Sequence, residues 1–386
     1  MLSIRRSNLL ATAAALLVSA SAVAAQTADF AGMDAYVAKA VRDWNVPGLA
    51  IAVVRGDSVV YARGFGVRRM GRPEAVDEHT LFAIGSTTKA FTATALAMLV
   101  DEGKVAWDDP VTKHVPGLML YDPYVTRALT VRDLLTHHSG LPNFDALWYA
   151  TDLPADELFR RLRFVKPTTG FRADYEYQNV MYALAGRVVA NASGMPWDEF
   201  VRRRILTPLA MRETVTDMRA LAAMRNVAIP HAEVDDTLRP IAPRDLENVA
   251  PAGAIYSSVS DMARWIRFQL DSTRVGGTRA VQAETFARMW TPQVTVPAAA
   301  YYPAARLANP HFIAYGLGWF LQDYRGREVW HHGGNVDGFT ALVAMLPEER
   351  LGLVILTNMN GTALPTALMN KVWDLQLGAP ARDWSG

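Results

Sequence analysis

The sequence predicts an α+β protein in which one antiparallel sheet is built from both ends of the chain and flanked by helices. Strand patterns occur near the N-terminus and again near the C-terminus, and a long, mainly helical stretch lies between them. The 386 residues, 51% of them hydrophobic, give ample material for a core. We expect a single domain over residues 26–386, with an α/β part at about 30–110 and 305–380 and a helical part at about 111–304.

The N-terminal elements follow from hydrophobic pattern and turn chemistry. A helix is expected over residues 33–44, and the unbroken apolar run 48–54 is typical of a buried strand. Residues 58–65 return as a second strand after a turn, which predicts a hairpin. A longer apolar helix is expected from Ser86, with Gly103 as its stop.

The rest of the chain reads as helices with many loops, followed by strands. Thr130 to Asp133 and Ser258 to Asp261 resemble capping boxes at helix starts. The expected C-terminal elements are strands over 315–322, 328–332, 339–346 and 351–357, and a last helix over about 363–377.

Residues 1–25 predict an export signal. Arg5 and Arg6 give a positive start, residues 9–18 are apolar, and residues 19–25 are rich in small side chains. The apolar run is too short to span a bilayer comfortably, so we expect a periplasmic or secreted protein without stable membrane insertion. Export through the general or the twin-arginine route stays open.

Composition narrows the function classes. A formal net charge of +1 gives no support for nucleic-acid binding, which needs a basic patch or stripe. The absence of cysteine excludes a thiol nucleophile and a cysteine-ligated metal. No His-Glu-x-x-His pattern is present, so we expect neither a metal site nor a cofactor.

Ser86-Thr87-Thr88-Lys89 is the most informative stretch. A hydroxyl and an amine three positions apart lie on one helix face, which places a nucleophile beside a base. A solvated lysine is a poor base at neutral pH, so Lys89 needs burial or a nearby positive charge to lower its pKa. Taken alone, the pattern also fits a helix cap and a solvated lysine.

Two later segments of the sequence supply possible partners for Ser86 and Lys89. Tyr177 and Asn179 stand at the entrance of an apolar helix, where a tyrosine can relay protons and an asparagine can orient a lysine or an amide. The strand segment with His331, His332 and Gly333 lets a substrate backbone approach its edge. Strand alternation sends the two histidines to opposite faces, so at most one points into a cleft.

In this order, the three segments resemble the serine β-lactamase and penicillin-binding-protein superfamily. Within it, the chain is similar to class C β-lactamase-related serine hydrolases: D-aminopeptidases, D-Ala-D-Ala carboxypeptidases and family VIII esterases. Supporting matches are Leu134 to Pro142, Pro251 to Gly253 and Tyr315 to Trp319, and the resemblance covers roughly residues 30–378.

The resemblance implies a β-lactamase/transpeptidase-like fold and a role for each residue. Ser86 would be acylated with Lys89 as its base, and Tyr177 would shuttle the leaving-group proton. Asn179 would position Lys89 or the substrate amide. His331-His332-Gly333 would replace the family's Lys-Thr-Gly, and the backbone N–H groups of Ser86 and Gly334 would hold the oxyanion. His137 and His138 belong to a loop motif and are interpreted as structural.

The lysine-to-histidine change directs the functional prediction. The replaced lysine helps to hold an antibiotic's carboxylate, whereas His331 would be only partly charged near neutral pH. We therefore expect a peptidase or amidase that acts on short or D-residue-containing peptides. A carboxylesterase or weak β-lactamase with the same site is the first alternative, and a non-catalytic penicillin-binding-like sensor or scaffold is the second.

Four aromatic residues would line a groove or pack on the surface: Trp148, Tyr149, Tyr301 and Tyr302. The exact substrate and the oligomeric state stay open.

Overall fold

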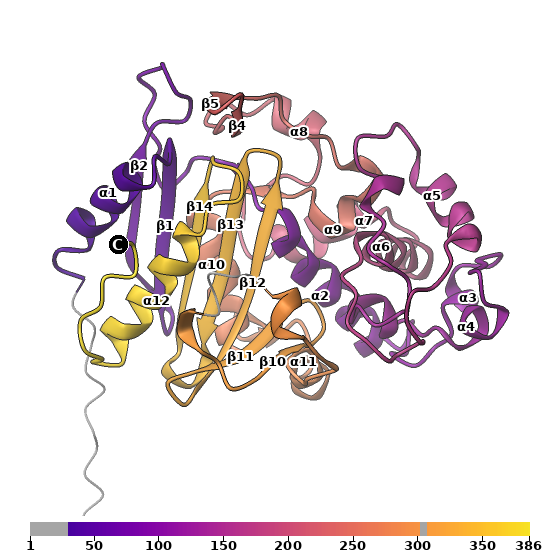
Figure 1. Ribbon diagram of the computed structural model, residues 1–386. Coiled ribbons are helices and arrows are strands. Elements are labelled where there is room, and N and C mark those ends of the chain that lie inside the picture. Colours follow the sequence, from indigo (N-terminus) through magenta and orange to yellow (C-terminus); the bar gives the residue numbers. More distant parts are fainter. Residues whose placement is uncertain (1–29, 302–306) are drawn as a thin grey trace, which may run out of the picture.

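The computed structural model describes residues 30–301 and 307–386 and has the predicted α+β architecture (Figure 1). An eight-stranded antiparallel sheet joins both ends of the chain in the order β2-β1-β14-β13-β12-β11-β10-β9. Its strands are β1 (Gly48–Arg55), β2 (Ser58–Gly66), β9 (Val294–Thr295), β10 (Ile313–Tyr315), β11 (Phe320–Tyr324), β12 (Arg327–Val336), β13 (Phe339–Leu346) and β14 (Leu351–Thr357). The predicted export signal at 1–25 lies outside the described residues.

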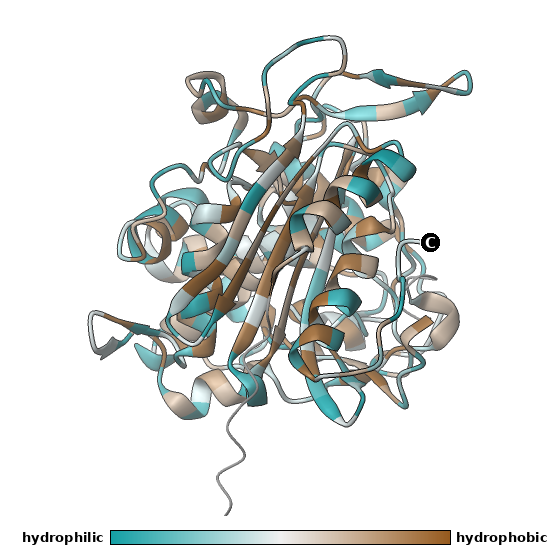
Figure 2. Cartoon of the chain, turned by 90° about the vertical axis from the view of Figure 1, so that its left-hand side faces the viewer, coloured by the Kyte–Doolittle hydropathy of each residue, from teal (hydrophilic) through white to brown (hydrophobic). Residues whose placement is uncertain are grey.

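Helices cover both faces of this sheet: α1 (Met33–Asp43) and α12 (Leu364–Gln376) on one, and α10 (Val259–Leu270) with α2 (Thr88–Asp101) on the other. Along β1, Leu49 and Ile51 face α1 and α12, whereas Ala50 joins the core around α10. Two covered faces explain why the central strands β1 and β14 are apolar along nearly their whole length (Figure 2). The rings of Phe91 in α2 and Trp265 in α10 stack at 3.9 Å.

The part between the two sheet-forming ends is less regular than predicted. Short helices and loops alternate with three two-stranded sheets. The helices are α3 (Val111–His114), α4 (Pro123–Ala128), α5 (Ala155–Arg161), α6 (Asn179–Ser193), α7 (Trp197–Val201), α8 (Met218–Ala222), α9 (Ala250–Gly253) and α11 (Ala283–Met289). The small sheets pair β3 (Phe82–Ala83) with β6 (Tyr256–Ser257), β4 (His231–Val234) with β5 (Thr237–Pro240), and β7 (Arg274–Val275) with β8 (Thr278–Arg279).

Two local predictions need correction. The expected strand 315–322 is a hairpin, because Gly318 adopts φ +85° and the N–H of Gly316 donates to the carbonyl of Trp319 at 2.8 Å. The expected helix start at Ser86 is a single 3-10 turn, η1 (Gly85–Thr87), and α2 follows it. Ser86 therefore lies on a tight turn at the helix entrance.

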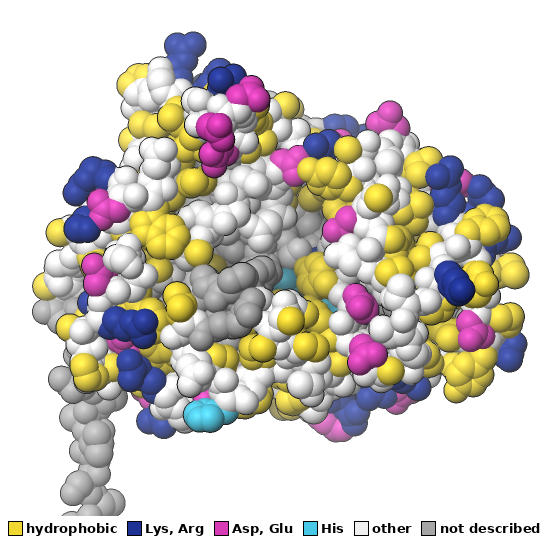
Figure 3. Space-filling model, in the orientation of Figure 1, with side chains coloured by type: hydrophobic (Ala, Val, Ile, Leu, Met, Phe, Trp, Pro, Cys, Tyr) yellow, Lys and Arg dark blue, Asp and Glu magenta, His cyan; other side chains and the backbone are white. Residues whose placement is uncertain are grey.

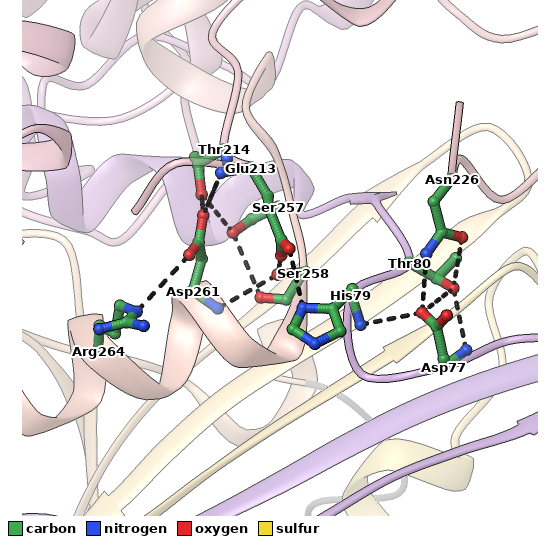
Figure 4. Close-up of polar contacts among 10 residues, drawn as sticks. All are labelled: Asp77, His79, Thr80, Glu213, Thr214, Asn226, Ser257, Ser258, Asp261 and Arg264. Atoms are coloured by element: carbon green, nitrogen blue, oxygen red, sulfur yellow. Dashed lines mark hydrogen bonds and ion pairs between the residues drawn. The ribbon is translucent and has the colours of Figure 1, made fainter. Parts of the chain in front are cut away.

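A cluster of hydrogen bonds anchors the segment that leads into Ser86 (Figure 4). The hydroxyl of Ser258 caps α10 by accepting from the N–H of Asp261, as the sequence predicts. The Asp261 carboxylate, whose pKa is raised by burial, accepts from the N–H groups of Glu213 and Thr214. Because β6 precedes this cap and pairs with β3, the cluster helps to fix β3 just before η1.

Within the two described ranges, 30–301 and 307–386, no helix combines the length and the apolar character that a membrane crossing requires.

Candidate active site

Ser86 lies where η1 touches the edge of β12. Gly85 has φ +51°, and a Cβ built on it would lie only 2.8 Å from the backbone nitrogen of Asn335. Only glycine allows both this backbone conformation and this close approach. Ser86 is half-buried and lines a cavity of about 360 Å³, together with Tyr177 and Asn179. Figure 3 shows the surface hollowed on this face of the molecule.

Lys89 is buried one helical turn beyond Ser86. Its Nζ contacts three oxygens: the Oγ of Ser86 at 3.0 Å, the Oδ1 of Asn179 at 2.8 Å and the carbonyl of Ala252 at 3.0 Å. Burial holds the pKa of Lys89 well below its ordinary value, and the negative charge of nearby Asp145 opposes that shift. The side chain is therefore disposed to be a neutral amine at a pH where a solvated lysine is an ammonium.

The three contacts of Lys89 fix the direction of its lone pair. A neutral amine has two N–H groups and one lone pair. The amide oxygen of Asn179 and the carbonyl of Ala252 only accept, so they take the two N–H groups. The third contact is a hydroxyl that can donate, so the lone pair faces Ser86. The geometry is that of a base positioned to take the proton of a serine hydroxyl.

Tyr177 and Asn179 reach the site from the start of α6. Asn179 is the first residue of that helix, and the extended backbone of Gln178 precedes it. The Lys89 Nζ lies 4.8 Å from the centre of the Tyr177 ring, and both tyrosine and asparagine line the cavity with Ser86. The structure thus brings Ser86, Lys89, Tyr177 and Asn179 together, although they come from two segments of sequence far apart.

The loop that carries His137 packs against the segment that carries Tyr177. The ring of His137 stacks on Tyr177 at 4.2 Å, and its Nδ1 accepts from the N–H of Gln178 at 3.0 Å, which puts the imidazole proton on Nε2. Burial keeps the pKa of His137 well below its ordinary value. His138 turns away and binds Asp133 at 2.8 Å. Of the two histidines, His137 alone makes a ring contact with Tyr177.

His332 is the histidine on the Lys89 side of β12. It pairs in register with Val343, which faces the core around α10. Its Nε2 lies 2.9 Å from the hydroxyl of Tyr315, and its ring centre lies 6.4 Å from that of Tyr177. Burial holds the pKa of His332 well below its ordinary value, with a smaller contribution from Lys89. It is therefore a neutral neighbour of the site.

His331 lies on the opposite face, as strand alternation requires. Its Nε2 hydrogen-bonds the hydroxyl of Tyr301, and with Gly333 it lines a separate cavity of about 520 Å³ beside α12. Burial lowers the pKa of His331 to about 3. The expectation that a partly charged His331 takes the place of the antibiotic-binding lysine is corrected on both counts: the side chain is neutral near pH 7, and it faces away from Lys89.

The pairing of β12 with β13 decides which backbone N–H faces Ser86. Neighbouring residues of an antiparallel strand direct their backbone groups to opposite edges. The carbonyl of Thr340 accepts from the side chain of Thr357 in β14 at 3.0 Å, so Ala341 directs its groups to β12. Gly334 is the register partner of Ala341. The N–H of Gly334 is therefore directed toward β13 and away from Ser86.

Asn335 provides the N–H at the edge that faces η1. Its backbone nitrogen and oxygen lie 2.8 and 3.0 Å from a Cβ built on Gly85, which agrees with the direction derived from the register. Gly334 is needed for packing instead: a Cβ on it would overlap the carbonyl oxygen of Ile84 and lie 3.1 Å from the Ser86 nitrogen. The second expected oxyanion donor is thus corrected from Gly334 to Asn335.

An ion pair at the cavity mouth has no counterpart in the sequence predictions. Arg244 donates to Asp337 from Nε at 3.0 Å and Nη2 at 2.8 Å, and the Tyr149 hydroxyl donates to the same carboxylate at 2.7 Å. All three side chains line the cavity with Ser86. The partners of this pair are 93 residues apart, so no local pattern links them. Its charges balance, so neither partner offers an isolated charge to a ligand.

Of the aromatic residues suggested for a groove, Trp148 and Tyr149 line the cavity, whereas Tyr301 is buried against His331. Tyr302 lies outside the described residues.

Within the described part of the chain, no cluster of three or more histidine, aspartate or glutamate side chains is arranged to hold a metal ion.

The chain belongs to the Beta-lactamase family, whose family model matches residues 33–377. Among curated proteins, it is 31% identical to the unguisins hydrolase ungD of Aspergillus violaceofuscus over 373 residues, which cover 90% of this chain and 65% of that protein. It is 23% identical to the protein flp of Staphylococcus aureus, over 86% of this chain and 64% of that one. The chain therefore spans just under two thirds of the length of these relatives.

Solved structures support the same fold. A penicillin-binding protein homologue from Pyrococcus abyssi, described as octameric, superposes with a TM-score of 0.79 at 25% identity, over 91% of this chain and 78% of that one. A D-stereospecific amidohydrolase from a Streptomyces species gives a TM-score of 0.71 at 25% identity, over 90% of this chain and 98% of that one. The β-lactamase-like fold expected from the sequence is confirmed.

Proposed function

We propose that the protein is an exported serine hydrolase that cleaves peptide or related amide bonds through an acyl-enzyme on Ser86. One observation carries the proposal: the buried amine of Lys89 donates to two acceptors, which leaves its lone pair for the Ser86 hydroxyl. A serine without such a partner is a weak nucleophile.

The proposed reaction has two halves. Lys89 takes the proton of the Ser86 hydroxyl as Oγ attacks the substrate carbonyl, and the N–H groups of Ser86 and Asn335 bind the resulting oxyanion. Tyr177 passes the proton that Lys89 has taken to the leaving amine, so that the C–N bond breaks and an ester is left on Ser86. A water molecule then attacks this ester and gives up a proton to the same base system, which returns a proton to the Ser86 Oγ as its bond to the acyl group breaks and the carboxylic acid is released.

Charge in the cavity favours an amide substrate over a carboxylate-bearing antibiotic. Burial keeps Lys89 and His332 neutral by lowering their pKa values, and His331 lines a separate cavity. Arg244 is paired with Asp337, and Asp145 adds a negative charge to the same cavity. An antibiotic carboxylate would therefore find no unpaired cation among the described cavity residues.

The name of one structural neighbour agrees with amide-bond chemistry, since that protein is a D-stereospecific amidohydrolase, and one curated relative is named a hydrolase of unguisins. Short or D-residue-containing peptides are therefore the first substrates to test. Ester hydrolysis, or weak β-lactamase activity, would use the same residues on other acyl donors. A non-catalytic sensor is disfavoured by the hydrogen bond between Lys89 and Ser86, which a scaffold does not need.

Replacement of Tyr177 by phenylalanine tests the amide assignment. An amine leaving group needs a proton, whereas a p-nitrophenolate leaves without one. We expect Tyr177→Phe to lower kcat/KM on D- and L-aminoacyl amides by on the order of 10²–10⁴-fold. The loss on p-nitrophenyl esters should be much smaller. The measurement is kcat/KM of the wild type and of Tyr177→Phe on matched amide and ester pairs, with nitrocefin included.

Tyr149→Phe is a suitable control, because it removes a hydroxyl at the mouth of the same cavity without touching Lys89. It should not distinguish amides from esters. Equal losses on amides and esters in Tyr177→Phe would contradict the proton-relay role, and turnover of nitrocefin above all amides would overturn the substrate assignment.

A further inference from the structure

Asp145 is a candidate for a role that neither the sequence patterns nor the family comparison assigns. It lies in the 3-10 turn Asp145–Leu147, beyond the loop that carries His137, and it lines the cavity with Ser86. Its Oδ1 accepts from the Nδ2 of Asn179 at 3.2 Å and from the indole Nε1 of Trp148 at 2.8 Å. A continuous chain of contacts thus runs from Asp145 through Asn179 and Lys89 to Ser86.

We propose that Asp145 is a positioning residue that fixes the orientation of the Asn179 amide and thereby aims the Lys89 lone pair at Ser86. This inference rests on the proposed serine hydrolase function and adds to it a residue that touches neither Lys89 nor Ser86 through a hydrogen bond.

The argument depends on the two ends of an amide. The Asn179 side chain offers an oxygen that accepts and a nitrogen that donates, and the two occupy nearly the same shape. With the oxygen toward Lys89, the amide takes one N–H of the amine, and the lone pair stays on Ser86. With the nitrogen toward Lys89, the amide would donate to that lone pair and compete with the Ser86 hydroxyl.

A carboxylate beside Asn179 selects one of these two orientations of the amide. An ionised aspartate only accepts hydrogen bonds, so its oxygen attracts the Nδ2 end of Asn179 and repels the Oδ1 end. The indole of Trp148 holds the same carboxylate oxygen in place from the other side. The negative charge of Asp145 also favours the protonated form of Lys89 and opposes the shift that burial produces.

Two substitutions distinguish the effect of Asp145 on the Asn179 amide from the effect of its charge on the pKa of Lys89. Asp145→Asn keeps the shape and one acceptor oxygen but removes the charge, whereas Asp145→Ala removes both. We expect the acid limb of the kcat/KM–pH profile to move to lower pH in both variants, because loss of the negative charge lowers the pKa of Lys89 further. We expect Asp145→Ala also to lose on the order of 10²-fold in the plateau value, because Lys89 is no longer aimed.

The experiment measures these pH profiles with a p-nitrophenyl ester, and in parallel the rate at which a fluorophosphonate probe labels Ser86. Asp152→Asn, which removes an exposed carboxylate that does not line the cavity, is the control and should leave the acid limb in place. Thermal unfolding checks that every variant is folded. Profiles of Asp145→Asn and Asp145→Ala that match the wild type would overturn the proposal, and so would an acid limb that moves to higher pH. A wild-type protein that neither labels nor turns over the ester would instead contradict the proposed function.

Discussion

Replacement of Lys89 by methionine is expected to abolish acylation, with a loss in kcat/KM on the order of 10⁶-fold, the scale for removing the nucleophile or base of a serine hydrolase. Methionine fits the buried position but has no lone pair with the basicity of an amine. Lys89→Arg sharpens the test, because a guanidinium carries a positive charge and does not deprotonate. Both variants should be inactive if Lys89 acts as the base.

The measurement is kcat/KM on the best amide and on a p-nitrophenyl ester, with unfolding curves for each variant. Lys104→Met provides the control: this lysine is half-exposed and pairs with Glu102 at the surface, so its loss should leave activity unchanged. Substantial turnover by Lys89→Arg would mean that the site needs the charge of Lys89 rather than its proton-accepting lone pair.

The pH dependence of the wild type follows from the same group. Burial depresses the pKa of Lys89 in the folded protein, so kcat/KM should rise as the pH increases through that lowered pKa and then level off. Activity confined to pH values near the ordinary lysine pKa would contradict a buried, neutral base.

Substitution of Gly334 by alanine is the second change with a large expected effect. The added Cβ would overlap the Ile84 carbonyl oxygen, so β12 and η1 must move apart. This movement separates the N–H of Asn335 from that of Ser86. Loss of one oxyanion donor is worth on the order of 10²–10³-fold in kcat. Overpacking of this kind also lowers the free energy of unfolding by about 1–3 kcal/mol.

Gly170→Ala is the control for this substitution. Gly170 is exposed, and the nearest heavy atom to its added Cβ is the Cβ of Ala173 at 3.3 Å. Its activity and its urea unfolding midpoint should stay close to those of the wild type. A Gly334→Ala variant with wild-type kcat would show that contact between β12 and η1 does not set the oxyanion site.

The elements that the sequence predicted well have strong local patterns. The strands at 339–346 and 351–357 match β13 and β14 residue for residue, since each is a mainly apolar run bounded by turn residues. The region from 111 to 304 was predicted less well, because its short helices depend on tertiary packing rather than on their own periodicity. The hairpin within 315–322 was missed, because its apolar residues continue through the turn at Gly318.

The residues of the site likewise fall into those that a local pattern predicts and those that only the tertiary structure brings together. The spacing of Ser86 and Lys89 is local, so the sequence alone brings them together. Asp145 lies 34 residues before Asn179, and nothing in the intervening sequence links them. The choice between Gly334 and Asn335 depends on which edge each residue faces, and that is set by the pairing of β12 with β13. These features require the tertiary structure.

The most direct test of the central claim is the identity of the acylated residue. The purified protein is incubated with a fluorophosphonate probe, digested, and mapped by mass spectrometry. A single adduct on Ser86, absent from the Ser86→Ala variant together with all hydrolysis, is the result predicted from the Lys89–Ser86 geometry. An adduct on another serine, or hydrolysis that survives in Ser86→Ala, would contradict it.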